Sequence, residues 1–88
     1  MLEKGIEAKV RDQARAAGWL VYKFTSPSRR SVPDRLFIRD GRYVFIEFKR
    51  PGNTLTSGQA REIERLRYAG AEVHVCYSAE EACDALGI

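Results

Sequence analysis

Apolar residues recur at helical spacing through the first part of the chain. The residues that make up this stripe are Leu2, Ile6, Val10, Ala14 and Ala17. Because residues three or four apart lie on one face of a helix, the spacing predicts an amphipathic first helix. Gly18 follows the stripe and suits the left-handed conformation at which many helices end. We therefore expect this helix to end just before Gly18.

Four short runs have the composition of β-strands. They are residues 19–24 (WLVYKF), 35–39 (RLFIR), 43–49 (YVFIEFK) and 73–77 (VHVCY). Asp40-Gly41 separates the second run from the third and predicts a two-residue hairpin turn. The reason is that both residues tolerate the positive φ of a type I′ turn. The middle of the chain is therefore expected to form an antiparallel hairpin.

Two further segments carry signals for the start of a helix. Thr56 to Gln59 fits a capping box, in which the first and last residues each bond the other's backbone N–H. The apolar stripe of the helix that follows consists of Ile63, Leu66 and Ala69. Gly70 is expected to end this helix. Ser78 and Glu81 fit a second capping box and predict a short last helix.

The order of these elements defines a fold class. Helix, three strands, helix, strand, helix (αβββαβα) indicates an α/β fold with a mixed four-stranded sheet flanked by helices. We expect residues 1–88 to form a single domain. Because so short a chain buries only about 60–65% of its unfolded surface, it is marginal as a monomer. A homodimer is therefore expected, since two-fold dimers are the commonest oligomers.

The composition excludes several classes of protein. No apolar run approaches the roughly 20 residues of a membrane helix. The N-terminus lacks the apolar core of a signal peptide, so we expect an intracellular protein that is not secreted. Cys76 and Cys83 are the only cysteines, too few for a disulfide framework or, with His74, for a zinc site. We expect reduced, buried thiols and a structural role for His74.

Positive charge is concentrated in the first part of the chain. Residues 1–50 carry 12 lysines and arginines against 6 acids, whereas residues 51–88 carry 3 against 6. Eleven of the fifteen cations are arginines, which suit bidentate recognition of phosphate. The charge alone is equally consistent with nucleic-acid binding and with an ordinary solvated surface.

The predicted hairpin brings two acids together. If Arg39 pairs with Arg42 across the turn, the same register places Asp34 opposite Glu47, with Cβ atoms roughly 5 Å apart. Lys49 lies two residues beyond Glu47 and therefore projects from the same face. The residues expected on the opposite, buried face are Val44, Ile46 and Phe48. Two acids and a lysine thus gather at one point of the sheet.

A hard divalent cation would explain this cluster, because opposed carboxylates otherwise repel each other. Mg²⁺ prefers one or two protein carboxylates and keeps several waters, which can generate a nucleophile. The Lys49 ammonium could orient the attacking water or stabilise the transition state. The alternative is a hairpin whose outer face is simply wet, with Glu47 and Lys49 as a weak ion pair. Geometry alone leaves both possibilities open.

The same residues resemble the signature of a nuclease superfamily. Pro33-Asp34 followed, after twelve residues, by Glu47-Phe48-Lys49 is similar to the PD-(D/E)XK motif. Their flanking sequences, together with Ser57-Gly58-Gln59, resemble the VRR-NUC branch. The resemblance implies a restriction-endonuclease-like core and a Mg²⁺ or Mn²⁺ cofactor. It also implies that Asp34, Glu47 and the Phe48 carbonyl bind the metal and that Lys49 is catalytic.

The resemblance extends to two further positions, with one departure. Gln59 matches the family's glutamine on the helix after the third strand, which implies a catalytic role, although it could serve only the capping box. Glu7 matches an acid that family members place near the metal, although it could be an ordinary boundary residue of its helix. Ser31 and Val32 precede Pro33 where a glycine is common, a departure that removes no ligand.

Basic residues near these motifs are candidates for nucleic-acid contact. Those expected to contact phosphate are Lys23, Arg29, Arg30, Arg35 and Arg50. Small stand-alone members of the family are phage-type proteins, so the resemblance implies a structure-selective endonuclease that cuts branched DNA, including Holliday (four-way) junctions, as a homodimer. The alternative is a non-catalytic nucleic-acid-binding module that uses the same basic face.

Overall fold

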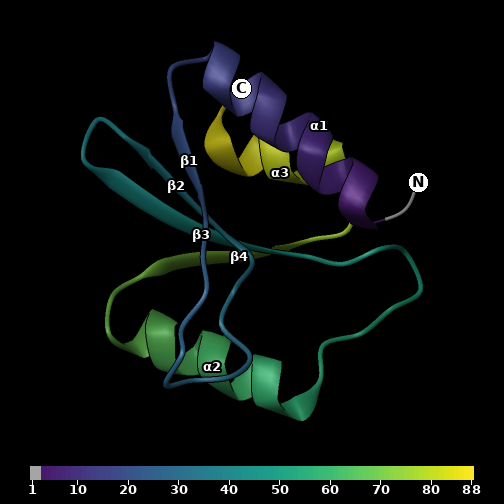
Figure 1. The fold of residues 1–88 in the computed structure, drawn as a ribbon, viewed down its shortest axis with the longest axis vertical. Coiled ribbons are helices and arrows are strands. Elements are labelled where there is room, and N and C mark those ends of the chain that lie inside the picture. The colour runs from purple at the N-terminus through teal and green to yellow at the C-terminus, as the bar shows by residue number, and fades with distance from the viewer. Residues whose placement is uncertain (1–2) are drawn as a thin grey trace.

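The chain folds into three layers, with a sheet between helices (Figure 1). The computed structural model describes residues 3–88, so Leu2 of the predicted helical stripe lies outside the described residues. In chain order the elements are α1 (Glu3–Ala16), β1 (Leu20–Lys23), β2 (Arg35–Arg39), β3 (Arg42–Phe48), α2 (Ser57–Tyr68), β4 (Glu72–Cys76) and α3 (Ala79–Leu86). Helices α1 and α3 cover one face, and α2 covers the other. The predicted αβββαβα order is confirmed.

The sheet is mixed, as the sequence predicts. Its strand order is β1-β2-β3-β4, with the first two pairs antiparallel and the β3–β4 pair parallel. A parallel pair needs a crossover connection, which α2 supplies between β3 and β4. The observed strands differ from the predicted ones by one residue at several ends, where local sequence specifies boundaries least well.

The hairpin turn has the predicted geometry. Asp40 and Gly41 have φ values of 49° and 81°, so both lie in the left-handed region that a type I′ turn requires. Arg39 is paired with Arg42, and the register continues without a bulge to Arg35 opposite Ile46. The next residues along the two strands are Asp34 and Glu47. The turn therefore sets the position of the two acids.

The main core lies between the sheet and the layer of α1 and α3. Its largest fully buried side chains include Phe37, Phe48, Ile46, Val10 and Val44. Three of these are the β3 residues predicted to face away from Glu47, so the predicted alternation of faces is confirmed. None of the helices within residues 3–88 is both long and apolar enough to cross a bilayer.

The two predicted capping boxes differ in outcome. Thr56 and Gln59 exchange both expected bonds at the start of α2. At α3 the Ser78 hydroxyl accepts from the Glu81 N–H, 3.0 Å away. The Glu81 carboxylate accepts instead from the Tyr77 N–H, 2.8 Å away, one residue before the position that a capping box requires. The second box is therefore only half formed.

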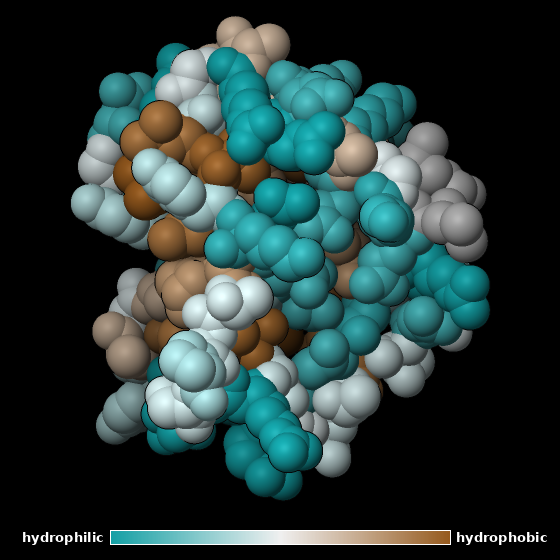
Figure 2. Space-filling model, viewed as in Figure 1, coloured by the Kyte–Doolittle hydropathy of each residue, from teal (hydrophilic) through white to brown (hydrophobic). Residues whose placement is uncertain are grey.

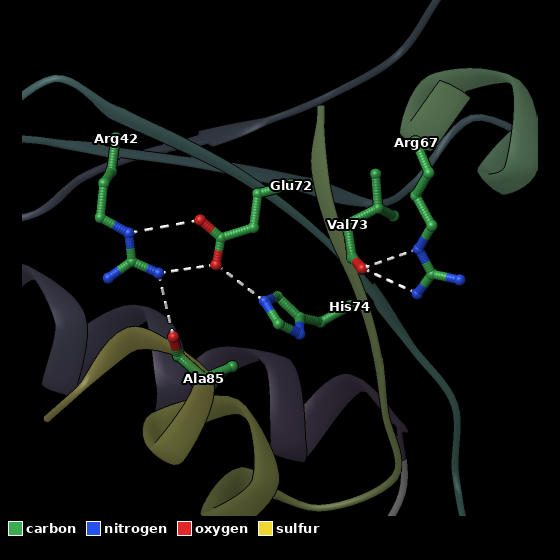
Figure 3. Close-up of polar contacts among 6 residues, drawn as sticks. All are labelled: Arg42, Arg67, Glu72, Val73, His74 and Ala85. Atoms are coloured by element: carbon green, nitrogen blue, oxygen red, sulfur yellow. Dashed lines mark hydrogen bonds and ion pairs between the residues drawn. The ribbon is translucent and has the colours of Figure 1, made fainter. Parts of the chain in front are cut away.

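Polar side chains tie β3, β4 and α3 together on the side of the sheet that holds α1 and α3 (Figure 3). Arg42 donates to the Glu72 carboxylate at 2.6 Å and to the Ala85 carbonyl at 3.2 Å. His74 Nε2 lies 2.8 Å from the same carboxylate, in keeping with the structural role expected for it. The hydrogen bond from Arg42, followed by that from His74, holds the pKa of Glu72 below its ordinary value. Cys76 and Cys83 are free thiols.

Candidate active site

Asp34 and Glu47 come from the open end of the hairpin. Asp34 directly precedes β2, and its Oδ2 accepts a hydrogen bond from the Phe48 N–H at 3.0 Å. Glu47 lies within β3 and is only 3% exposed. This burial contradicts the alternative of a wet outer face on the hairpin. A buried acid in the middle of a strand needs an explanation, since burial of an unpaired charge is costly.

The pKa values of both acids are raised. Burial raises the pKa of Glu47 to about 7, the negative charge of Asp34 adds to the effect, and Lys49 opposes it. Burial also raises the pKa of Asp34, against the hydrogen bond from Phe48, and the charge of Glu7 raises it further. The pair is therefore costly to keep ionised. Such perturbed acids gather at functional sites more often than elsewhere.

Lys49 and Gln59 converge on one oxygen of Glu47. Lys49 Nζ lies 3.7 Å from Glu47 Oε2, and Gln59 Nε2 donates to the same atom at 3.3 Å. The other end of the Gln59 amide, Oε1, accepts from the Thr56 N–H at 3.0 Å. One side chain therefore completes the capping box and contacts Glu47, and its catalytic role stays a prediction. The start of α2 is fixed to the acid pair by this amide.

A cavity of about 340 Å³ opens beside Asp34. Its lining comes from α1, the end of β1 and the loop 24–34, and includes Glu7, Lys23, Arg29 and three hydroxyl side chains of that loop. Hydrophilic side chains gather across the middle of the molecule, between the layer of α1 and α3 and the layer of α2 (Figure 2). The polar cavity makes Asp34 accessible to a ligand.

The structure separates the predicted basic residues into two groups. Arg30, Arg50 and Lys23 are exposed. Arg35 donates to the Glu7 carboxylate across the gap between β2 and α1, and Arg29 is paired with Glu62 of α2. Of the predicted phosphate-binding residues, Lys23 and Arg29 line the cavity. The Arg35 side chain is only 15% exposed, which limits its access to a phosphate.

Two acids near the site escaped the sequence analysis. Glu3 lies close enough to raise the pKa of both Asp34 and Glu47. Its spacing of four from Glu7 was the available signal, because residues four apart share a helix face. Glu62 is buried beside Arg29 and Arg65. No local pattern indicates it, since it adjoins the apolar stripe of α2 like many solvated acids.

The donor set fits a hard divalent cation. Among residues 3–88 no group of three or more acid, histidine or cysteine side chains is placed to hold a metal, and Asp34 and Glu47 are a neighbouring pair of acids with raised pKa values. Mg²⁺ and similar ions are commonly held by one or two carboxylates, with water completing the shell. The mutual repulsion of these two acids would be relieved by such an ion. In this structure Glu7 is engaged by Arg35.

A mixed sheet that brings a buried acid, a half-buried acid and a lysine to the open end of a hairpin is typical of the PD-(D/E)XK class of nuclease. The chain belongs to the VRR-NUC domain family, whose model matches residues 10–80. A solved VRR-NUC domain structure superposes with a TM-score of 0.87 at 29% sequence identity. The match covers 97% of this chain and 94% of that one.

A phage protein is also similar to the chain. "Putative nuclease p44" of Acyrthosiphon pisum secondary endosymbiont phage 1 is 43% identical over 74 residues. The match covers 83% of this chain and 80% of that protein. The restriction-endonuclease-like fold and the family implied by the sequence motifs are therefore confirmed.

Proposed function

We propose that this protein is a Mg²⁺- or Mn²⁺-dependent endonuclease that hydrolyses phosphodiester bonds in branched DNA, including four-way junctions. The observation that carries the proposal is the buried Glu47, which lies beside Asp34 and receives both Lys49 and Gln59 on one oxygen. A binding surface without catalysis has no use for this arrangement, because uncompensated acids repel DNA.

Each residue of the cluster has a distinct part in this proposal. Asp34, Glu47 and the Phe48 carbonyl hold the divalent cation, and Glu7 can join them only if its pair with Arg35 opens. When bound, such a cation would activate water as the nucleophile and offset phosphate charge. The Lys49 ammonium stabilises the negative charge that develops on the phosphate oxygens. Gln59 keeps the Glu47 carboxylate in position.

The preference for branched DNA follows from what the fold can present to a duplex. Each of the three helices among residues 3–88 packs on the sheet, and the longest connections are the irregular loops 24–34 and 49–56, so no helix is free to enter a groove and read bases. Contacts to phosphates, and the shape of the DNA, are then the available sources of selectivity. The exposed cations near the motifs are Lys23, Arg29, Arg30 and Arg50.

A homodimer would place two such sites on two DNA strands, as junction cleavage requires. An apolar row supports this part of the proposal. Leu20 is opposite Ile38, and Ile38 is opposite Tyr43, so the three side chains cross the sheet on the face away from α1. Leu20 is 56% exposed and Tyr43 is 60% exposed. Hydrophobic atoms border a notch at the left of Figure 2. Burial against a second copy would remove this surface from water.

The test is cleavage of labelled junction, flap, duplex and single-stranded DNA at fixed salt, with and without Mg²⁺. The wild type is expected to cut the branched substrates only when Mg²⁺ is present. Glu47→Ala should abolish cutting, and Lys49→Met should slow it by about 10²–10³-fold at saturating DNA. Lys9→Met, on the exposed side of α1, is the matched control and should cut normally.

The outcomes separate the nuclease from a binding module. Equal cutting by the wild type and both site variants would place the activity in a contaminant and refute the proposal. Salt-dependent DNA binding that is indifferent to Mg²⁺, with no product from any substrate, would establish the non-catalytic module instead. Cutting of RNA alone would retain the nuclease and reject DNA as its substrate.

A further inference from the structure

An ion pair between an exposed arginine and a buried glutamate fixes the loop that forms one wall of the cavity. Arg29 Nε donates to Glu62 Oε1 at 3.2 Å, and Arg29 Nη2 lies 3.2 Å from the same oxygen. Glu62 is only 7% exposed, and Arg65 contributes a third nitrogen at 3.4 Å. A charge buried to this extent is normally present only when it is paired. The contact joins positions 33 residues apart in sequence.

The same loop approaches α2 at a second point. A Cβ added to Gly58 would lie 3.0 Å from the Ser31 hydroxyl oxygen, so the helix and the loop are nearly in contact. Ser31 has a φ of 67°, in the left-handed region that favours glycine. The left-handed φ of Ser31 explains why a glycine would suit this position, two residues before Pro33. Figure 1 shows the loop between β1 and β2 running alongside α2.

The contact with Glu62 orients Arg29 but leaves part of its guanidinium available to a second partner. A guanidinium has five N–H groups, and Glu62 engages the edge formed by Nε and Nη2. The nitrogen Nη1 has no partner among residues 3–88, and the side chain is 48% exposed. Arg29 also lines the cavity, together with Lys23 and the hydroxyl side chains of Thr25, Ser26 and Ser31. Two cations and three hydroxyls are the groups that bind phosphate.

We propose that this cavity is a subsite for a backbone phosphate next to the bond that is cut, and that Glu62 is the positioning residue that aims Arg29 into it. The inference rests on the proposed function, because it assigns part of the substrate to a place beside Asp34. Glu62 touches no substrate itself. It acts by holding the guanidinium in one orientation, which lowers the entropy lost when phosphate binds.

The direction in which Glu62→Gln changes DNA affinity distinguishes a positioning role of Glu62 from a general electrostatic effect. Removing an acid from a DNA-binding surface normally strengthens binding, because repulsion of phosphate is relieved. Glu64→Gln, an exposed acid of the same helix, should follow this rule. Glu62→Gln makes the same change in charge and should weaken binding by about three- to tenfold, because Arg29 loses its orientation.

The experiment measures the affinity of the full chain for a fluorescent four-way junction by anisotropy in EDTA, across a salt series. Arg29→Gln should weaken binding about tenfold and reduce the slope of log K against log salt by about 1. Glu62→Gln should have no further effect in the Arg29→Gln background. Arg29→Lys keeps the charge but loses the side-on contact, so it should bind nearly as weakly as Arg29→Gln.

Each result supports or overturns the inference. Tighter binding by Glu62→Gln, additive losses in the double variant, or full affinity of Arg29→Lys would overturn it. If Glu62→Gln fails to fold, as judged by its melting curve, Arg29→Lys decides the question alone, because residue 29 lies on an exposed loop. Absence of cleavage by the wild type would refute the nuclease, whereas normal cleavage with unchanged affinities would refute only the subsite.

Discussion

Glu47 is the residue at which the requirements of stability and of chemistry oppose each other most directly. Its carboxylate is buried in a strand beside Asp34, and within residues 3–88 Lys49 is the one cation that offsets the two negative charges at close range. In a metal-free protein this arrangement favours the protonated acid. While no cation is bound, the two neighbouring carboxylates therefore lower the free energy of unfolding.

The cost predicts a pH-dependent difference between the wild type and Glu47→Gln in the presence of EDTA. The pKa of Glu47 rises from 4.5 to about 7 on folding, so the folded state binds its proton more tightly. The stability that this proton contributes is complete below pH 4.5 and is lost as the pH rises through 7. Above that range Glu47→Gln should be more stable than the wild type by up to about 3 kcal/mol.

Urea unfolding from pH 4.5 to pH 8.5 measures this difference. Glu64→Gln is the control, because that acid is exposed on α2. A constant difference between Glu47→Gln and the wild type across the range would show that Glu47 titrates normally. Adding Mg²⁺ should restore stability to the wild type at high pH and leave Glu47→Gln nearly unchanged, because only the charged acid gains from the ion.

At the scale of the element, the first turn of α2 joins a helix cap to the candidate active site. Gln59 accepts from the Thr56 N–H with one end of its amide and donates to Glu47 with the other. Helix stability and site geometry thus depend on one side chain. Substitutions that preserve one contact and disrupt the other can separate the two.

Thr56→Ala and Gln59→Glu should have opposite effects. Thr56→Ala removes the oxygen that accepts from the Gln59 N–H and should cost about 1 kcal/mol, or a few degrees in Tm, with kcat nearly intact.

Gln59→Glu keeps a residue that completes capping boxes but places a third carboxylate against Glu47. It should therefore melt close to the wild type at low pH and lose most of its activity near neutral pH. Full activity of Gln59→Glu would show that the amide serves only the cap.

Local chemistry explains which parts of the molecule the sequence predicts. Asp40-Gly41 specifies its own turn, and the register then places Asp34 beside Glu47 by counting along two strands. The pairs Glu7–Arg35 and Arg29–Glu62 join residues 28 and 33 positions apart. They depend on how a loop and two helices pack together, and the hydrophobic periodicity of the sequence does not indicate that packing. The sequence therefore predicts the acid pair but not the partners of the nearby arginines.

For the whole molecule, the part of the sheet that α2 leaves uncovered is the feature most in need of a partner. Strand β1 is an edge of the sheet, and α2 packs chiefly over β4 at the opposite edge. The row of Leu20, Ile38 and Tyr43 is left on the open part of that face. Exposed apolar edges favour association with another sheet.

Leu20→Lys should therefore shift the protein from dimer to monomer, since a lysine on an edge strand opposes pairing. Sedimentation velocity at several concentrations measures the shift. The substitution lies outside the acid cluster, so nicking of one strand of the junction should persist while paired cleavage of both strands is lost. Ile88→Lys, at another exposed apolar position, is the control. A monomeric wild type at all concentrations would remove the dimer from the proposal.

Because the Gln59 amide bonds both Thr56 and Glu47, the opening rate of the first turn of α2 also affects the site. Whenever the first turn of α2 frays, Glu47 loses a hydrogen-bond donor, so the lifetime of that turn limits how long the site stays complete. Amide hydrogen exchange can follow this opening. Glu47→Ala should lower the protection of the Thr56 N–H by about threefold to tenfold, because Gln59 loses its anchor. The Glu81 N–H, at the start of α3, should be unaffected. Equal protection of the Thr56 N–H in the wild type and in Glu47→Ala would show that opening of the first turn of α2 does not depend on Glu47.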